Sequence, residues 1–144
     1  MSTEQNKTLV RRWFEAFSSG DLAAVDDLWA ADVVDHSPAV PNQAPGREGI
    51  KQIVTSFRAA YPDLAFTVED LIADGDKIAS RWIAHGTNTG AFMGMPPTGK
   101  QVTIPGILIV RVAGGTMVES WVNFDALGMM QQLGVIPTPE PVHV

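Results

Sequence analysis

The chain has 144 residues and a formal net charge of −6, from ten Lys and Arg against sixteen Asp and Glu. It has no basic run, so the sequence predicts neither nucleic acid nor an anionic membrane surface as a partner. The absence of cysteine excludes disulfides, zinc–thiolate sites and a cysteine nucleophile. No secretory signal is recognisable, and no apolar run approaches the ~20 residues that span a bilayer, so we expect a cytoplasmic protein.

Helices are predicted in the first part of the chain. The apolar residues of 5–18 and of 48–60 recur at the spacing that places them on one face of a helix. Between these segments, Asp21 is typical of an N-cap, and we expect it to begin a further helix with Trp29 among its inward residues.

The rest of the chain has the pattern of strands. Residues 33–35 are interpreted as a short strand or turn, and the prolines of 36–46 exclude a regular helix there. Longer strands follow, separated by glycine-containing turns and loops: 64–70, 77–88, 102–112 and 116–123. A short helix at 126–133, capped by Asp125, comes last.

This order of elements predicts the α+β class. Three N-terminal helices would pack on one face of a curved antiparallel sheet, and the two layers would enclose a cone-shaped cavity. No internal repeat is present. We expect residues 1–136 to form a single domain and the proline-rich residues 137–144 to form an extended tail.

Alternation along the strands divides their residues between two faces. The predicted inner face carries several small side chains: Ser80, Ala84, Gly86, Gly106 and Ser120. Small residues facing the helices favour a pocket, although large helix residues could also fill the space. Arg81, Arg111 and Glu119 fall on the predicted outer face, where cross-strand ion pairs can form.

Several stretches of the sequence resemble one known family. The most specific are Tyr61–Leu64, Gly94–Gly99 and Phe124–Gly134, and weaker ones lie at 11–17, 20–22, 34–38 and 45–49. Together they run in order from about residue 5 to residue 135, and they resemble the SnoaL-like polyketide cyclase (ester cyclase) family of the nuclear transport factor 2-like superfamily.

The resemblance implies a cone-shaped α+β barrel, an apolar pocket, small hydrophobic substrates that are often flat polyketides, and no cofactor. The best-known members close a ring by intramolecular aldol addition, and an acidic residue on the last strand moves the proton. That position is Val122 here, and two nearby polar positions of the family are Leu108 and Gly106. Residues expected around the pocket are Trp13, Phe17, Trp29, Ile53, Phe57, Trp82, Met95, Leu108, Ser120 and Val122.

Because a valine cannot accept a proton, two other polar residues are candidates for the chemistry. His36 could act as a general base or hydrogen-bond donor at the pocket mouth. The other interpretation is a loop histidine bonded to local backbone, with Asp35 and Ser37 capping the turn. Asn88 could orient a substrate carbonyl or a water, or it could cap the end of its strand.

The leading hypothesis is a cofactor-free cyclase or isomerase that acts on an apolar polyketide- or terpenoid-like substrate mainly by positioning it, with His36 and Asn88 assisting proton transfer. The alternative is a non-catalytic protein that binds a hydrophobic ligand. Epoxide hydrolysis ranks last, because the predicted inner faces carry no Asp–Arg–Asp set. The histidines at 36, 85 and 143 lack metal-ligand spacing, so no metal is expected.

An apolar group on the predicted outer sheet face indicates an oligomer. Trp121 falls there beside Met117 and Ile109. Unless another segment of the chain covers Trp121, these residues predict a homodimer formed through this face.

Overall fold

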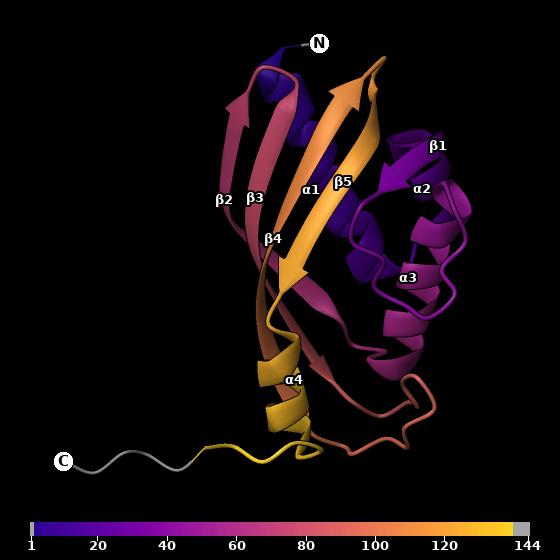
Figure 1. Ribbon diagram of the computed structural model, residues 1–144. Helices are drawn as coiled ribbons and strands as arrows, with labels where there is room; N and C mark the ends of the chain where they lie inside the picture. The colour runs from indigo at the N-terminus through magenta and orange to yellow at the C-terminus, as the bar shows by residue number, and fades with distance from the viewer. Residues whose placement is uncertain (1, 140–144) are drawn as a thin grey trace, which may run out of the picture.

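The structure, a computed structural model, describes residues 2–139 (Figure 1). The elements of this part of the chain are α1 (Thr3–Ser19), α2 (Leu22–Leu28), β1 (Trp29–Asp35), α3 (Arg47–Ala60), β2 (Ala65–Asp74), β3 (Lys77–Thr87), β4 (Gln101–Ala113), β5 (Thr116–Phe124) and α4 (Ala126–Leu133). Within residues 2–139, no helix combines the length and apolar character needed to cross a membrane. The tail predicted at 137–144 lies mostly outside the described residues, as does His143.

The strands form one curved sheet in the order β1-β5-β4-β3-β2, with α1, α2 and α3 to one side of it (Figure 1). The successive pairs β2–β3, β3–β4 and β4–β5 are antiparallel. The predicted α+β class is therefore confirmed. Two details differ from the expectation: the sheet stays open, with β1 and β2 as its edges, and β1 pairs with β5 in parallel.

The start of β1 corrects the predicted end of the second helix. Helix α2 ends at Leu28, and Trp29 is already extended, with φ −113° and ψ 138°. The β-branched pair Val33 and Val34 further along favours a strand over continued helix. Trp29 is nevertheless buried, with 1% of its surface exposed, because it lies on the face of β1 that packs against the core.

The predicted alternation of faces holds along β3 and β4, where every second residue is buried. It fails at the start of β5. A register shift opposite Arg111 and Val112 moves Met117 to the inner face, where its side chain is fully buried. The prediction that Met117 lies beside Trp121 on the outer face is therefore wrong, because a β-bulge swaps the faces of a strand.

Asp125 begins α4 as predicted. Its Oδ1 accepts a hydrogen bond from the Gly128 N–H at 2.8 Å, which satisfies one of the free donors at the helix start. At the other end, Gly134 has φ +80°, a left-handed conformation that glycine adopts without steric cost.

Candidate functional site

A cavity of about 100 Å³ lies between the inner face of the sheet and helices α1 and α3. Nine of the ten side chains predicted around a pocket line it: Trp13, Phe17, Trp29, Ile53, Phe57, Trp82, Leu108, Ser120 and Val122. The tenth, Met95, lies in the loop between β3 and β4 and packs against the core without reaching the cavity. A role for these residues in binding substrate stays a prediction.

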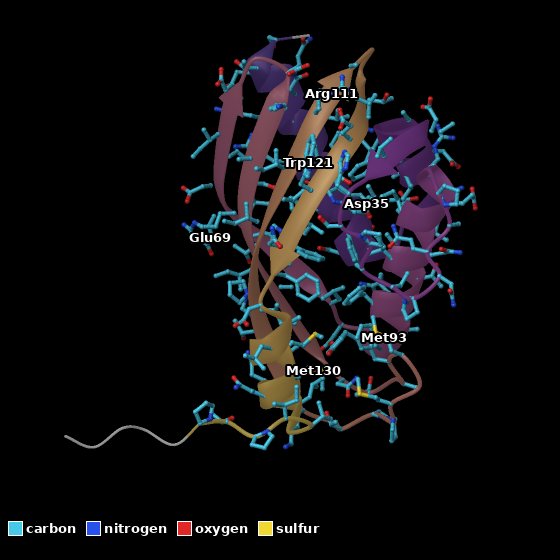
Figure 2. All side chains as sticks on the ribbon, in the orientation of Figure 1. Asp35, Glu69, Met93, Arg111, Trp121 and Met130 are labelled. Atoms are coloured by element: carbon cyan, nitrogen blue, oxygen red, sulfur yellow. The ribbon has the colours of Figure 1, made fainter. Side chains whose placement is uncertain are left out.

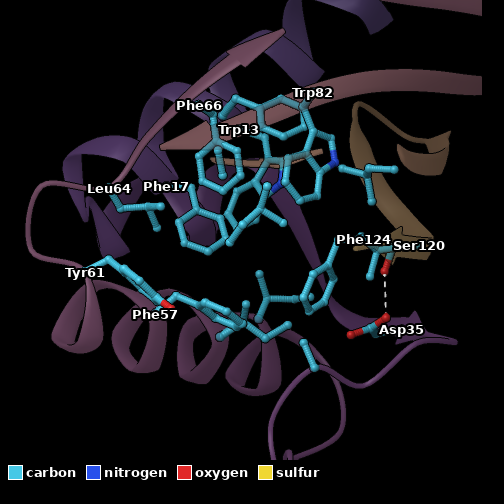
Figure 3. A pocket seen from close by; sticks show the side chains of 18 of the residues that line it. Trp13, Phe17, Asp35, Phe57, Tyr61, Leu64, Phe66, Trp82, Ser120 and Phe124 are labelled. Atoms are coloured by element: carbon cyan, nitrogen blue, oxygen red, sulfur yellow. Dashed lines mark hydrogen bonds between the residues drawn. The ribbon is translucent and has the colours of Figure 1, made fainter. Parts of the chain in front are cut away.

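The cavity wall is rich in aromatic side chains, which are closely packed (Figure 3). The rings of Trp13 and Trp29 meet edge to face with their centroids 5.1 Å apart, and those of Phe66 and Trp82 do so at 5.2 Å. The wide Trp82 ring lies over Gly106, its partner on β4, where a Cβ would collide with it. At this position, a small inner-face residue therefore accommodates a large neighbour and leaves no open space.

One carboxylate belongs to the cavity lining of the described residues, that of Asp35. Asp35 ends β1, on the same face as the buried Val33. It pairs with Ser120 across the parallel β1–β5 ladder, so both side chains reach the same side of the sheet. The Ser120 hydroxyl donates to Asp35 Oδ1 at 3.3 Å (Figure 3).

Further hydrogen bonds hold the Asp35 carboxylate in a fixed orientation. The Ser37 N–H donates to Oδ1 at 3.0 Å, and Gln43 Nε2 donates to Oδ2 at 2.8 Å. Gln43 Oε1 in turn accepts from the Ala39 N–H at 2.9 Å, and Ala39 lines the cavity. Asp35 thus anchors the proline-rich loop 36–46 beside the cavity.

In the sequence, Asp35 is predicted only to cap a turn, within the alternative interpretation of His36. It does cap that turn, through the Ser37 N–H, but it also lines the cavity. Period-two alternation from Val33 places Asp35 on the inner face. A segment as short as 33–35 does not define an inner face from the sequence alone.

Two polar groups on the cavity wall have no hydrogen-bond partner among the described residues: the indole N–H of Trp29 and the hydroxyl of Tyr61. Both residues are only 1% exposed. Burial raises the pKa of the Tyr61 hydroxyl above its ordinary value, because the phenolate would lose its hydration. Tyr61 is therefore a neutral donor at physiological pH.

His36 lies outside the cavity lining. Its Nε2 is 2.8 Å from Glu119 Oε2, and its ring stacks on Trp121 with centroids 4.8 Å apart and an interplanar angle of 7°. Both partners lie on the outer part of β5, and Figure 2 shows Trp121 on the sheet while Asp35 lies beside the helices. The geometry gives no support to a catalytic role of His36 in this cavity.

The outer cluster consists of His36, Arg111, Glu119 and Trp121, and the Glu119 carboxylate contacts both His36 and Arg111. Besides His36, it binds the guanidinium of Arg111, whose Nε lies 2.6 Å from Oε1. The hydrogen bond from His36, followed by that from Arg111, lowers the pKa of Glu119 below its ordinary value. The predicted outer-face ion pair between Arg111 and Glu119 is present.

Trp121 is half-buried, since His36 covers one side of its ring and Lys77 Nζ lies 5.8 Å from the ring centroid. Exposed apolar area on this face comes instead from Ile107 and Ile109 of β4, which are 49% and 37% exposed. A homodimer through the outer face stays a prediction.

The side chain of Asn88 forms hydrogen bonds that hold the loop after β3 in place. It is 2% exposed, and its amide nitrogen donates to the carbonyls of Ala60 and Gly90 at 3.3 and 2.9 Å. Its Oδ1 accepts from the Thr98 N–H and hydroxyl at 2.9 and 3.0 Å. With these contacts the amide is saturated, which agrees with a capping role and leaves no free group for a substrate.

The fold and the cavity identify the class of the protein. Residues 7–133 match the model of the SnoaL-like polyketide cyclase family, and the chain belongs to this family.

Individual relatives cover nearly the whole chain. Aklanonic acid methyl ester cyclase DnrD of Streptomyces peucetius is 28% identical, over 97% of this chain and 97% of its own. TsrD from Streptomyces laurentii superposes with a TM-score of 0.86 at 26% identity, covering 94% of this chain and 99% of that one. IdmH from Streptomyces antibioticus, described as a candidate polyketide cyclase, gives a TM-score of 0.79 at 36% identity, with coverage of 90% and 99%.

Proposed function

We propose that the protein is a cyclase for a polyketide-like substrate in which Asp35 takes the part of the acid–base residue. The observation that carries this proposal is the Asp35 carboxylate at the cavity wall, paired with Ser120. Membership of the cyclase family supports the type of reaction. The position that the resemblance assigns to the acid–base residue is Val122, which lines the same cavity without a titratable group.

The step is an intramolecular aldol addition. Asp35 removes a proton from the carbon between two carbonyl groups, which leaves an enolate. The enolate carbon then forms a bond to the carbon of another carbonyl group in the same molecule. The oxygen of that carbonyl becomes an alkoxide, which takes back the proton from Asp35. Atoms and electrons balance without an oxidant or reductant, so we expect the reaction to need no cofactor.

An apolar cavity rich in aromatic side chains suits this chemistry, because it can hold the flexible chain near its attack geometry. The relative DnrD is an aklanonic acid methyl ester cyclase, which supports a flat, ketone-bearing substrate of this class for the present chain. Trp13, Trp82 and Phe66 offer the flat apolar surfaces that such rings pack against.

The size of the cavity adds a requirement. At about 100 Å³ it is smaller than the roughly 300–1,000 Å³ typical of ligand pockets. A cavity of about 150 Å³ holds one benzene ring. A substrate of even one ring therefore needs a wall to move, and we expect loop 36–46, which Gln43 connects to Asp35, to shift when the substrate enters.

The test is ring closure of aklanonic acid methyl ester, followed by chromatography, because the product has the mass of the substrate and differs in retention. Asp35→Asn should lower turnover by about 100-fold or more, the usual effect of removing a general base. Asp70→Asn makes the same chemical change at an exposed ion pair with Arg81 and serves as the matched control. Turnover by Asp35→Asn at the wild-type rate would remove Asp35 from the mechanism.

A second candidate function is binding without catalysis. The apolar residues Leu108 and Val122 favour it, because they line the cavity where the resemblance expects polar groups or, at Val122, the acid–base residue itself. Thermal stabilisation by the ester without product from the wild type would support this alternative over the cyclase.

A further inference from the structure

Among the described residues, three buried side-chain atoms have no hydrogen-bond partner: the Tyr61 hydroxyl, the Trp29 indole N–H and Asn6 Oδ1. Of these residues, Tyr61 and Trp29 line the cavity. A buried donor without a partner destabilises a folded protein, and most buried polar groups are hydrogen-bonded for this reason. Ser80 and Ser120 follow the rule, since Ser80 donates to the Leu108 carbonyl at 3.0 Å and Ser120 to Asp35 at 3.3 Å. Unpaired donors that line a cavity are therefore candidates for contact with a ligand.

The Tyr61 hydroxyl and the Asp35 carboxylate belong to different sides of the lining. In Figure 3, Asp35 and Ser120 lie at one side and Tyr61 and Leu64 at the opposite side, with Phe57 between them. Asp35, when ionised, only accepts hydrogen bonds, whereas the Tyr61 hydroxyl can donate one. The cavity is thus complementary to an apolar body that carries an acceptor oxygen away from Asp35.

We propose that Tyr61, which lies across the cavity lining from Asp35, is a specificity-determining residue that hydrogen-bonds a carbonyl oxygen of the ligand, and that the cavity selects cyclic or aromatic ketones over hydrocarbons of the same shape. This rests on the proposed function, since the carbonyl would belong to the substrate whose acidic proton faces Asp35. A hydrocarbon analogue leaves the Tyr61 hydroxyl unpaired in an apolar site, and such a loss is a strong source of discrimination.

The test uses two ligands of nearly equal shape, acetophenone and α-methylstyrene, in which C=O is replaced by C=CH₂. Affinities come from titrations followed by two-dimensional ¹⁵N–¹H NMR. The wild type should bind the ketone about fivefold to tenfold more tightly, the range expected for one net hydrogen bond. In Tyr61→Phe the ratio should fall toward one, because the ring remains and only the hydroxyl is removed.

The thermal stability of Tyr61→Phe distinguishes a role of the Tyr61 hydroxyl in ligand recognition from a role in holding the fold together. The unfolding temperature of unliganded Tyr61→Phe should equal or exceed that of the wild type, because an unpaired buried hydroxyl is removed. A lower unfolding temperature, an unchanged affinity ratio, or no measurable binding of acetophenone would each overturn the proposal. These outcomes are independent of Asp35: if Asp35→Asn keeps its turnover while the ketone selectivity depends on Tyr61, only the assigned base fails.

Discussion

At the level of single residues, the carboxylate of the site and the valine of β5 are close neighbours in the fold. Asp35 pairs with Ser120, two residues before Val122, and the Ser37 hydroxyl accepts a hydrogen bond from the Val122 N–H at 3.1 Å. Both side chains reach the same cavity. A proton acceptor can therefore be supplied from β1 to a substrate that lies against β5.

Replacing His36 tests the outer cluster apart from the cavity. His36→Ala should raise the pKa of Glu119 toward its ordinary value near 4.5, because the hydrogen bond that contributes most to the lowered pKa is lost. Since the pKa of Glu119 is lowered in the folded state, its contribution to stability is present above pH 4.5 and is lost as the pH falls. The acid limb of the stability profile should accordingly flatten in His36→Ala.

NMR titration of the Glu119 carboxyl measures the shift, and Asp70 provides an internal reference on another strand. We also expect cyclase turnover in His36→Ala to stay far closer to the wild-type rate than in Asp35→Asn, because the His36 ring contacts Glu119 and Trp121. An unmoved Glu119 pKa would show that Arg111 alone determines it.

Among the elements, the loop between β3 and β4 depends on one side chain. Asn88 makes four hydrogen bonds that join this loop to the end of α3 and to Thr98. The loop residue Phe92 packs on Phe57 of the cavity wall, with ring centroids 4.9 Å apart. Asn88 thus supports the cavity through the loop.

Asn88→Ala should reduce the free energy of unfolding by about 2–3 kcal/mol, because buried backbone and hydroxyl groups lose their partners. Denaturant unfolding measures this change. Asn123→Ala, an exposed position on β5, is the control and should change stability by less than about 0.5 kcal/mol. Equal stabilities of the two variants would contradict the role assigned to Asn88.

The elements also show where sequence patterns succeed. Periodicity located the helices and the long strands because their apolar faces are regular over many residues. It misplaced Trp29 and Met117 for local reasons. At Trp29, helix α2 passes directly into a strand, and no glycine or proline separates the two elements in the sequence. At Met117, the pattern of apolar and polar residues does not reveal the β-bulge.

For the whole molecule, the sequence could predict that helices and sheet enclose an apolar space, and nine of ten expected residues line it. It could not locate the polar groups of the site. Asp35 reaches the cavity only because the short β1 pairs in parallel with β5, a contact between segments more than 80 residues apart. His36, one residue further, falls outside the cavity lining.

The measurement that tests the account most directly is the rate of ring closure in an Asp35→Asn/Val122→Asp double variant, compared with Asp35→Asn alone and with the wild type. If the cavity needs one carboxylate and accepts it from either strand, the double variant should regain at least about tenfold in turnover over the single variant. Two results would contradict the assignment of Asp35 as the relocated acid–base residue. One is turnover by Asp35→Asn at the wild-type rate, and the other is a folded Asp35→Asn/Val122→Asp variant that is no faster than Asp35→Asn.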